Sequence, residues 1–193
     1  MSNARMIEQT SDRMTEAEVS LRLAAFLLNL PGSDGSAEVA IDGASVTVGG
    51  TPVFDVEGFL SRQSWNQTAR EGKNQWTGTY QKDGKKLRVH CGSGSGDVVA
   101  VVGPYRIVAE CKKGSSTLKK GSPQRPLLTS ALGQALLLHM KPNDLAVAAV
   151  PDTSEFRKIA EQWRERPLVK KTGIRICLVG QDGNVDGLSD LIF

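Results

Sequence analysis

The stretch from Asp97 to Lys112, DVVAVVGPYRIVAECK, constrains the fold of this chain more than any other. It holds two apolar runs rich in β-branched residues, Val98–Val102 and Tyr105–Ala109, separated by Gly103-Pro104. Gly-Pro is a strong turn signal, and short apolar runs on either side of a turn predict a β-hairpin. We therefore expect a sheet that contains this hairpin.

Charged residues stand at both ends of the predicted hairpin. Asp97 opens the first strand, and Glu110 and Lys112 close the second, with Cys111 between them. Because side chains alternate along a strand, Glu110 and Lys112 should face one side and Cys111 the other. The turn brings the start of the first strand back beside the end of the second. Two carboxylates and a lysine should therefore meet at one end of the sheet.

This combination of groups suits metal-assisted chemistry on phosphates. Mg²⁺ takes one or two carboxylates from a protein and keeps several waters. A bound metal acidifies water and stabilises charge on a phosphoryl oxygen, and an adjacent lysine can orient that water or stabilise the charge. The pattern Asp97…Glu110-Cys111-Lys112 thus resembles the motif of the PD-(D/E)XK nuclease superfamily, which has the restriction-endonuclease-like fold. The sequence departs from that motif at Gly96, where the family has proline.

The resemblance implies a role for each motif residue. Asp97 and Glu110 would bind Mg²⁺ or Mn²⁺ together with the main-chain carbonyl of Cys111, and Lys112 would position or activate the attacking water. The reaction would be phosphodiester hydrolysis, with DNA favoured over RNA because most of the superfamily acts on DNA. The oligomeric state is left open, a homodimer included.

Three further residues are accessory candidates. Members of the superfamily often carry a glutamate on the first helix that approaches the metal, which points to Glu16 and Glu18. Glu18 also fits a capping role, which is the simpler interpretation. Gln134 lies on the second predicted helix, where the RecB-like members show Gln-x-x-x-Tyr. Leu138 stands four residues after Gln134, so that subgroup is not supported.

The rest of the chain predicts alternating helices and strands around the hairpin. Thr15 and Glu18 form a capping box that begins a helix over 15–30, and Pro31-Gly32 ends it. Apolar periodicity and turn signals predict the other elements. They are strands at 37–41, 45–48, 52–59, 77–81 and 85–91, a helix at 124–139, a strand at 145–150, a helix from Thr153 or Ser154 to Pro167, and a strand at 174–179. Asp42-Gly43 predicts a hairpin over 37–48, and Asp83-Gly84 predicts a second hairpin between 77–81 and 85–91.

The predicted fold class is α/β, with a mixed central sheet flanked by helices. Helix 15–30, strands 85–91, 98–102 and 105–111, helix 124–139 and strand 145–150 follow the order αβββαβ. This is the core that the nuclease superfamily shares. In this assignment residues 33–80 are an extra β-excursion.

Charge is distributed unevenly along the chain. Residues 70–125 hold twelve Lys or Arg and four Asp or Glu, a net charge of +8, while the whole chain is +3. A basic segment around the candidate site is the electrostatic footprint of a nucleic-acid-binding protein. Within a Gly/Ser-rich loop and at its end lie the lysines and arginine expected to contact phosphates, namely Lys113, Lys119, Lys120 and Arg125. A solvated basic loop is the alternative interpretation.

Composition places the chain among ordinary globular proteins. Its 193 residues are 39% hydrophobic and 23% charged, which fits one domain over residues 5–193. Residues 1–4 include Ser-Asn-Ala, which resembles an expression-vector remnant. There is no apolar run of about 18 residues, so a membrane partner is not expected. Three widely spaced cysteines favour a reducing, cytoplasmic setting.

Two other functions remain open from the sequence. The same fold can serve as a nucleic-acid- or protein-binding module that does not cut. Alternatively, Glu110 and Lys112 form a solvated pair on a strand and Asp97 is a turn residue, in an α/β domain unrelated to nucleases. Metal binding would distinguish the nuclease from both.

Overall fold

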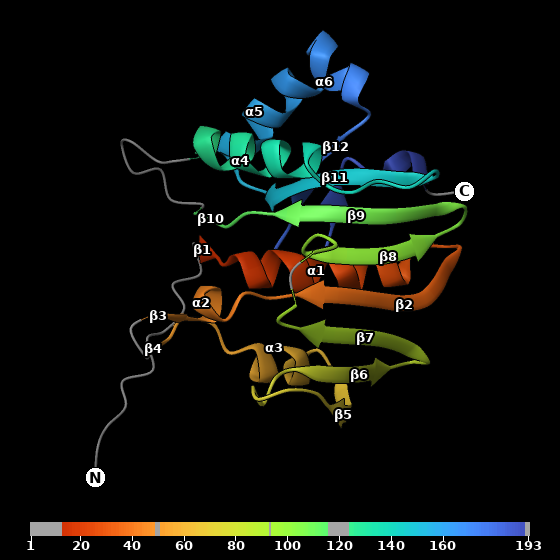
Figure 1. Ribbon diagram of the computed structural model, residues 1–193. Coiled ribbons are helices and arrows are strands. Elements are labelled where there is room, and N and C mark those ends of the chain that lie inside the picture. The colour runs from red at the N-terminus through yellow and green to blue at the C-terminus, as the bar shows by residue number, and fades with distance from the viewer. Residues whose placement is uncertain (1–12, 49–50, 93, 116–123, 192–193) are drawn as a thin grey trace.

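A nine-stranded mixed sheet forms the centre of the protein (Figure 1). The computed structural model describes residues 13–48, 51–92, 94–115 and 124–191. In sheet order the strands are β13 (Val185–Asp186), β12 (Arg175–Val179), β11 (Asp144–Pro151), β9 (Tyr105–Cys111), β8 (Val98–Val102), β2 (Ser33–Ala40), β7 (Lys85–His90), β6 (Gly78–Lys82) and β5 (Asn66–Arg70). Two small pairs lie outside the sheet, β1 (Arg13–Met14) with β10 (Gly114–Ser115) and β3 (Thr47–Val48) with β4 (Thr51–Pro52).

Helices lie on both faces of the sheet (Figure 1). They are α1 (Glu16–Asn29), α2 (Gly43–Val46), α3 (Val56–Arg62), α4 (Gln124–Leu136), α5 (Ser154–Arg164) and α6 (Pro167–Thr172), followed by a 3₁₀ turn at Ser189–Leu191. Among the described residues, no helix is long and apolar enough to cross a membrane. The coarse prediction of an α/β protein with a mixed sheet is confirmed.

The predicted hairpin is present as β8 and β9. The two strands are antiparallel, with Val98 opposite Ala109 and Val102 opposite Tyr105. Gly103 in the turn has φ 55°, which suits glycine. On the far side of β9, β11 runs parallel to it, as expected for a buried strand reached through a helical crossover.

Alternation along the strands sends one set of side chains to each face. Val98, Ala109 and Val39 belong to the core cluster that α1 shares with the sheet. Their neighbours in sequence point to the opposite face. On that face α4 packs against β9 and β11, and α5 packs against β12.

The region after α1 differs from its prediction. Residues 33–40 form a single strand, β2, that pairs with β8 on one side and β7 on the other. The hairpin expected over 37–48 is therefore wrong, since α2 follows β2. The strand expected over 52–59 is also wrong, because the Asp55 side chain accepts a hydrogen bond from the Gly58 N–H (2.8 Å) and caps α3.

These differences change which segment is extra. Because β2 lies in the middle of the sheet, residues 33–80 are not a β-excursion. The predicted hairpin around Asp83-Gly84 is confirmed as β6 and β7, which extend the sheet beyond β2 together with β5.

The first helix forms as its capping residues predict. The Glu18 N–H donates to Thr15 Oγ1 at 3.1 Å, so Thr15 is the N-cap. The Glu18 carboxylate does not complete the capping box, because it accepts two hydrogen bonds from Arg22 at 3.0 and 2.8 Å. The helix predicted over 124–139 ends earlier, at Leu136, which is 59% exposed, whereas Leu128 is buried.

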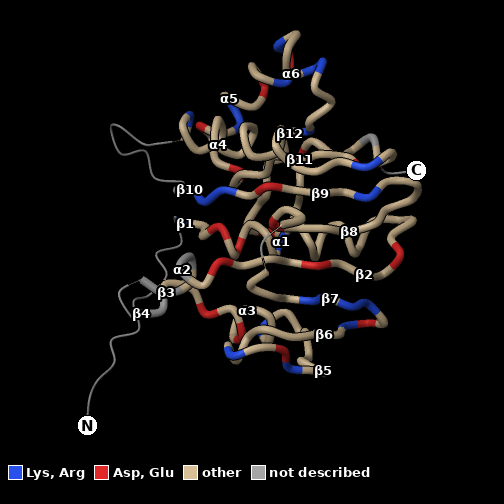
Figure 2. The backbone as a smooth tube through the Cα atoms, in the orientation of Figure 1, with Lys and Arg blue, Asp and Glu red and all other residues tan. Residues whose placement is uncertain are grey.

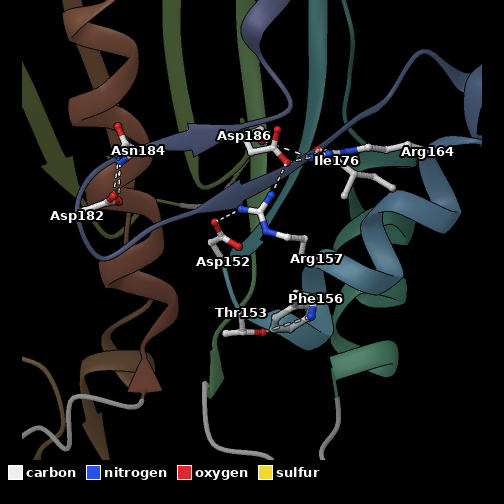
Figure 3. Close-up of polar contacts among 9 residues, drawn as sticks. All are labelled: Asp152, Thr153, Phe156, Arg157, Arg164, Ile176, Asp182, Asn184 and Asp186. Carbon is white, nitrogen blue, oxygen red and sulfur yellow. Dashed lines mark hydrogen bonds and ion pairs between the residues drawn. The ribbon is translucent and has the colours of Figure 1, made fainter.

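Arginines hold α5 against the last strands (Figure 3). Arg164 donates to Asp186 at 2.8 Å and to the Ile176 carbonyl at 2.7 and 3.1 Å. Arg157 pairs with Asp152 and lies 3.6 Å from Asp186. This network holds α5 against β12 and β13, which form the edge of the sheet opposite to β5.

Candidate functional site

Asp97 lies immediately before β8, beside Glu110 of β9. Val98 lies opposite Ala109, so the residues on either side of this pair, Asp97 and Glu110, meet at the end of the hairpin. The Asp97 N–H donates to the Ala109 carbonyl at 2.8 Å, and the Cys111 N–H donates to Asp97 Oδ2 at 2.7 Å. Main-chain hydrogen bonds therefore hold Asp97 against β9.

The backbone conformation at Gly96 explains why this position, which is proline in the PD-(D/E)XK motif, is glycine here. Its φ is +94°, which proline cannot adopt, because its ring holds φ near −65°. A Cβ on Gly96 would lie 2.9 Å from Val108 Cγ1 and 3.0 Å from the Ala109 carbonyl oxygen. Glycine therefore allows the chain to turn tightly over β9 immediately before Asp97.

Lys112 joins the hairpin to the start of α1. Its Nζ donates to the Cys111 carbonyl at 2.8 Å and to Glu16 Oε1 at 3.2 Å. The Lys112 side chain is only 12% exposed, and its main-chain N–H donates to Ala149 of β11. Figure 2 shows the basic end of β9 close to the acidic start of α1. Glu16, a candidate only by resemblance, thus belongs to the same cluster as the motif.

Burial, together with the neighbouring charges, raises the pKa values of both motif carboxyls. Burial raises the pKa of Glu110 to about 7, and the Asp97 charge adds to this shift while Lys112 opposes it. Burial also raises the pKa of Asp97, although the Cys111 N–H and Lys112 counteract it. Raised pKa values mean that the charged forms of these carboxyls are disfavoured here, and a cation bound beside them would favour the charged forms.

Cys111 contributes only main-chain groups to the cluster. Its side chain is fully buried on the α1 face, and burial raises the pKa of its thiol well above the ordinary value. The thiol is therefore inert, while its N–H serves Asp97 and its carbonyl serves Lys112.

The atoms of this cluster that could bind a metal ion are hard oxygen ligands. No group of three His, Cys, Asp or Glu side chains suited to a metal occurs in the part of the chain that the structure describes. Mg²⁺ does not require three, since one or two carboxylates, carbonyl oxygens and waters satisfy it. Among the described residues, none donates a hydrogen bond to the Glu110 carboxylate, whose pKa is raised by its own burial. The donor set of Asp97, Glu110 and the Cys111 carbonyl therefore fits a Mg²⁺-type ion.

The other predicted residues lie outside this cluster. Glu18 is buried in its pair with Arg22, and Gln134 is exposed towards the C-terminal end of α4. Lys113 is exposed beside the cluster, while Arg125 lies over the Trp163 ring at 5.7 Å. Lys119 and Lys120 fall outside the described residues, as do residues 1–4.

A second cluster of charged residues, which local sequence patterns did not predict, lies on β2 and β7, two to three strands away from Glu110. Arg88 and His90 of β7 approach Glu38 of β2 at 3.8 and 3.9 Å. In the sequence Arg88 and His90 alternate with Leu87 and Val89, which predicts that Arg88 and His90 share one face of a strand. Their acidic partner was hidden because the pairing of β2 with β7 joins segments about fifty residues apart in sequence.

Comparisons with models of protein families, with curated proteins and with solved structures found no match. The cluster itself combines two carboxylates, a carbonyl oxygen and an ammonium group in one half-buried place. Such a set can hold a divalent cation, orient a water and stabilise negative charge that develops beside it.

Proposed function

We propose that this protein is a metal-dependent nuclease that hydrolyses phosphodiester bonds, with DNA as the favoured substrate. The observation that carries the proposal is the meeting of Asp97 and Glu110 at the end of one hairpin, with Lys112 held beside them. A structural ion pair alone would not need two carboxylates that repel one another there.

The order of elements around the site agrees with this proposal. Helix α1, strands β2, β8 and β9, helix α4 and strand β11 follow one another as αβββαβ, with β5 to β7 added at the edge beyond β2. This order matches the core of the PD-(D/E)XK superfamily, once β2 replaces β7 as its first strand. The fold supports the assignment, while the function depends on the site.

Each residue has a role that follows from its contacts. Asp97, Glu110 and the Cys111 carbonyl would hold Mg²⁺ or Mn²⁺, which when bound supplies positive charge to acidify a water and to stabilise a phosphoryl oxygen. Lys112 has three N–H donors, and among the described residues Cys111 and Glu16 accept from two of them. The third would hold the attacking water or stabilise negative charge on the phosphate. Glu16 thereby orients the ammonium group.

A cleavage assay with matched variants tests the proposal. The protein is incubated with linear, circular, branched and single-stranded DNA and with RNA, in Mg²⁺, Mn²⁺ or EDTA. Asp97→Asn, Glu110→Gln and Lys112→Ala should each lower metal-dependent cleavage at least about 100-fold. Lys171→Ala is the control, because Lys171 is an exposed lysine on α6 with no assigned role and its removal changes the net charge equally.

Two results would contradict the proposal. Metal-dependent cleavage at the full rate in Glu110→Gln would show that the cut occurs elsewhere or comes from a contaminant. Absence of cleavage on every substrate, with nucleic-acid binding retained, would favour the binding-module function instead.

A further inference from the structure

A cavity of about 360 Å³ lies on the open face of the sheet, next to the motif residues. Glu38 and Ala40 of β2, Arg88 and His90 of β7 and Val99 of β8 line it. Gly96, the residue immediately before Asp97, forms part of its wall. The helices on this face, α4 and α5, pack against β9, β11 and β12. The described helices therefore leave the face over β2 and β7 open.

The strand registers place this cavity in line with the proposed catalytic site. His90 lies opposite Ala40, the Ala40 N–H donates to the Asp97 carbonyl at 2.9 Å, and Asp97 is the neighbour of Glu110. These four residues form one row from β7 through β2 and the residue before β8 to β9. Neighbouring strands are about 4.8 Å apart, so β2 lies about 10 Å from β9 and β7 about 14 Å. A cavity at this distance suits the nucleotide beside a phosphate bound at Glu110.

The hydrogen bonds of His90 define what it can offer a ligand. The Gly92 N–H donates to His90 Nδ1 at 3.0 Å, so the ring proton of the neutral histidine lies on Nε2. Nε2 lies 3.9 Å from Glu38 Oε2, which is too long for a hydrogen bond. Arg88 donates to Glu71 at 3.0 Å and lies beside the same Glu38 carboxylate. The cavity therefore presents donors and a carboxylate acceptor side by side.

This chemistry suits the edge of a nucleobase better than a phosphate. A base carries N–H groups that can donate hydrogen bonds to the Glu38 carboxylate. Next to them it carries acceptor atoms that can receive hydrogen bonds from His90 and Arg88. A phosphate would meet the repulsion of the Glu38 carboxylate. Ala40 and Val99 supply a small apolar floor on which a planar ring can rest. A base held by its pairing edge cannot be paired with another base at the same time.

We propose that the cavity lined by Glu38, Arg88 and His90 binds an unpaired nucleobase of the substrate, next to the phosphate that is cut. This subsite rests on the proposed nuclease function for its position relative to the cut, but its binding chemistry does not depend on cleavage. It makes single-stranded, frayed or flipped nucleotides the preferred substrate class.

An abasic scan of a single-stranded oligonucleotide tests the subsite. Binding of a labelled 12-mer is measured by fluorescence anisotropy in EDTA, with one base removed at each position in turn. Removal at one position should weaken binding roughly tenfold, in the range that one base contributes in single-strand-binding proteins. That position-specific loss should vanish in Glu38→Ala, and also in Val99→Phe, which fills the cavity without changing a charge.

Glu57→Ala is the matched control, because Glu57 is an exposed carboxylate on α3 and its removal changes the net charge equally. It should keep the position-specific loss. A loss that persists in both cavity variants would overturn the subsite, as would a wild-type protein that binds no oligonucleotide or shows no preferred position. Melting temperatures confirm that each variant is folded.

The outcomes separate the subsite from the nuclease. A position-specific loss that the cavity variants abolish, in a protein that cuts no substrate, would support the subsite and reject the nuclease. Cleavage that Glu110→Gln abolishes, without any position-specific loss in EDTA, would support the nuclease and overturn the subsite.

Discussion

Replacement of Glu110 by glutamine should stabilise the metal-free protein at alkaline pH. Burial and the charge of Asp97 raise the pKa of Glu110 from its ordinary value of 4.5 to about 7. The folded protein therefore resists ionisation of this carboxyl, whereas the unfolded chain does not. Glutamine has nearly the same shape and no charge, so Glu110→Gln removes this penalty.

The sign and size of the effect follow from linkage. Because the folded pKa is the higher one, the stabilising contribution is complete below about pH 4.5 and is lost as the pH rises through about 7. At about 1.36 kcal/mol for each pKa unit, the shift from 4.5 to about 7 sets an upper limit of roughly 3–4 kcal/mol. Glu110 is only half-buried, and solvent screening reduces the expected difference to about 1–2 kcal/mol. Glu110→Gln should exceed the wild type in unfolding free energy by this amount at pH 8, and match it near pH 4.5.

Urea unfolding in EDTA between pH 4.5 and pH 8 measures this difference in unfolding free energy. Added Mg²⁺ should then reverse the order of stability of the two proteins at pH 8. A ligand at 100 times its dissociation constant stabilises a folded protein by about 2.7 kcal/mol. Mg²⁺ should therefore stabilise the wild type at pH 8 and leave Glu110→Gln nearly unchanged. Glu57→Gln serves as the control for loss of an exposed carboxylate. Parallel pH profiles for the wild type and Glu110→Gln, or equal stabilisation of both by Mg²⁺, would refute the electrostatic argument.

Two further predictions concern the scaffold of the site and of the sheet. Gly96→Ala should lower the unfolding free energy by about 1–3 kcal/mol, because the φ of +94° and the contacts of an added Cβ both strain the turn before Asp97. Urea unfolding measures this loss, and an unchanged unfolding free energy would contradict the geometry. Arg164→Ala should lower the unfolding free energy by about 1.5–3 kcal/mol, because the Ile176 carbonyl loses the hydrogen bonds that Arg164 donates to it. Arg157 is more exposed, so Arg157→Ala should cost less than about 1 kcal/mol. Thermal melts compare the two variants, and equal losses would contradict this ranking.

Local sequence signals were sufficient for the elements that carry the motif. The turn at Gly103-Pro104 predicted the hairpin, and Thr15 predicted the start of α1, because each signal acts through residues close in sequence. The presence of Asp97 and Glu110 at one end of the hairpin followed from the same turn.

Local signals failed where a short apolar segment could form either a helix or a strand. Residues 52–59 were predicted as a strand, yet the Asp55 side chain caps a helix there. Residues 37–41 were predicted as part of a local hairpin, yet β2 finds its partners in β7 and β8, about fifty to sixty residues away. Pairing of this kind is decided by which strands bury their apolar faces under α1, and no short window of sequence contains that information.

The sequence by itself thus determined the motif, the hairpin that presents it and the α/β class. Only the tertiary structure decided that Glu16 reaches Lys112 across 96 residues of chain, and that His90 and Ala40 continue the row of Asp97 and Glu110 across the sheet. The reason is physical: a turn or a cap acts between near neighbours, whereas the register between distant strands depends on the packing of the whole core.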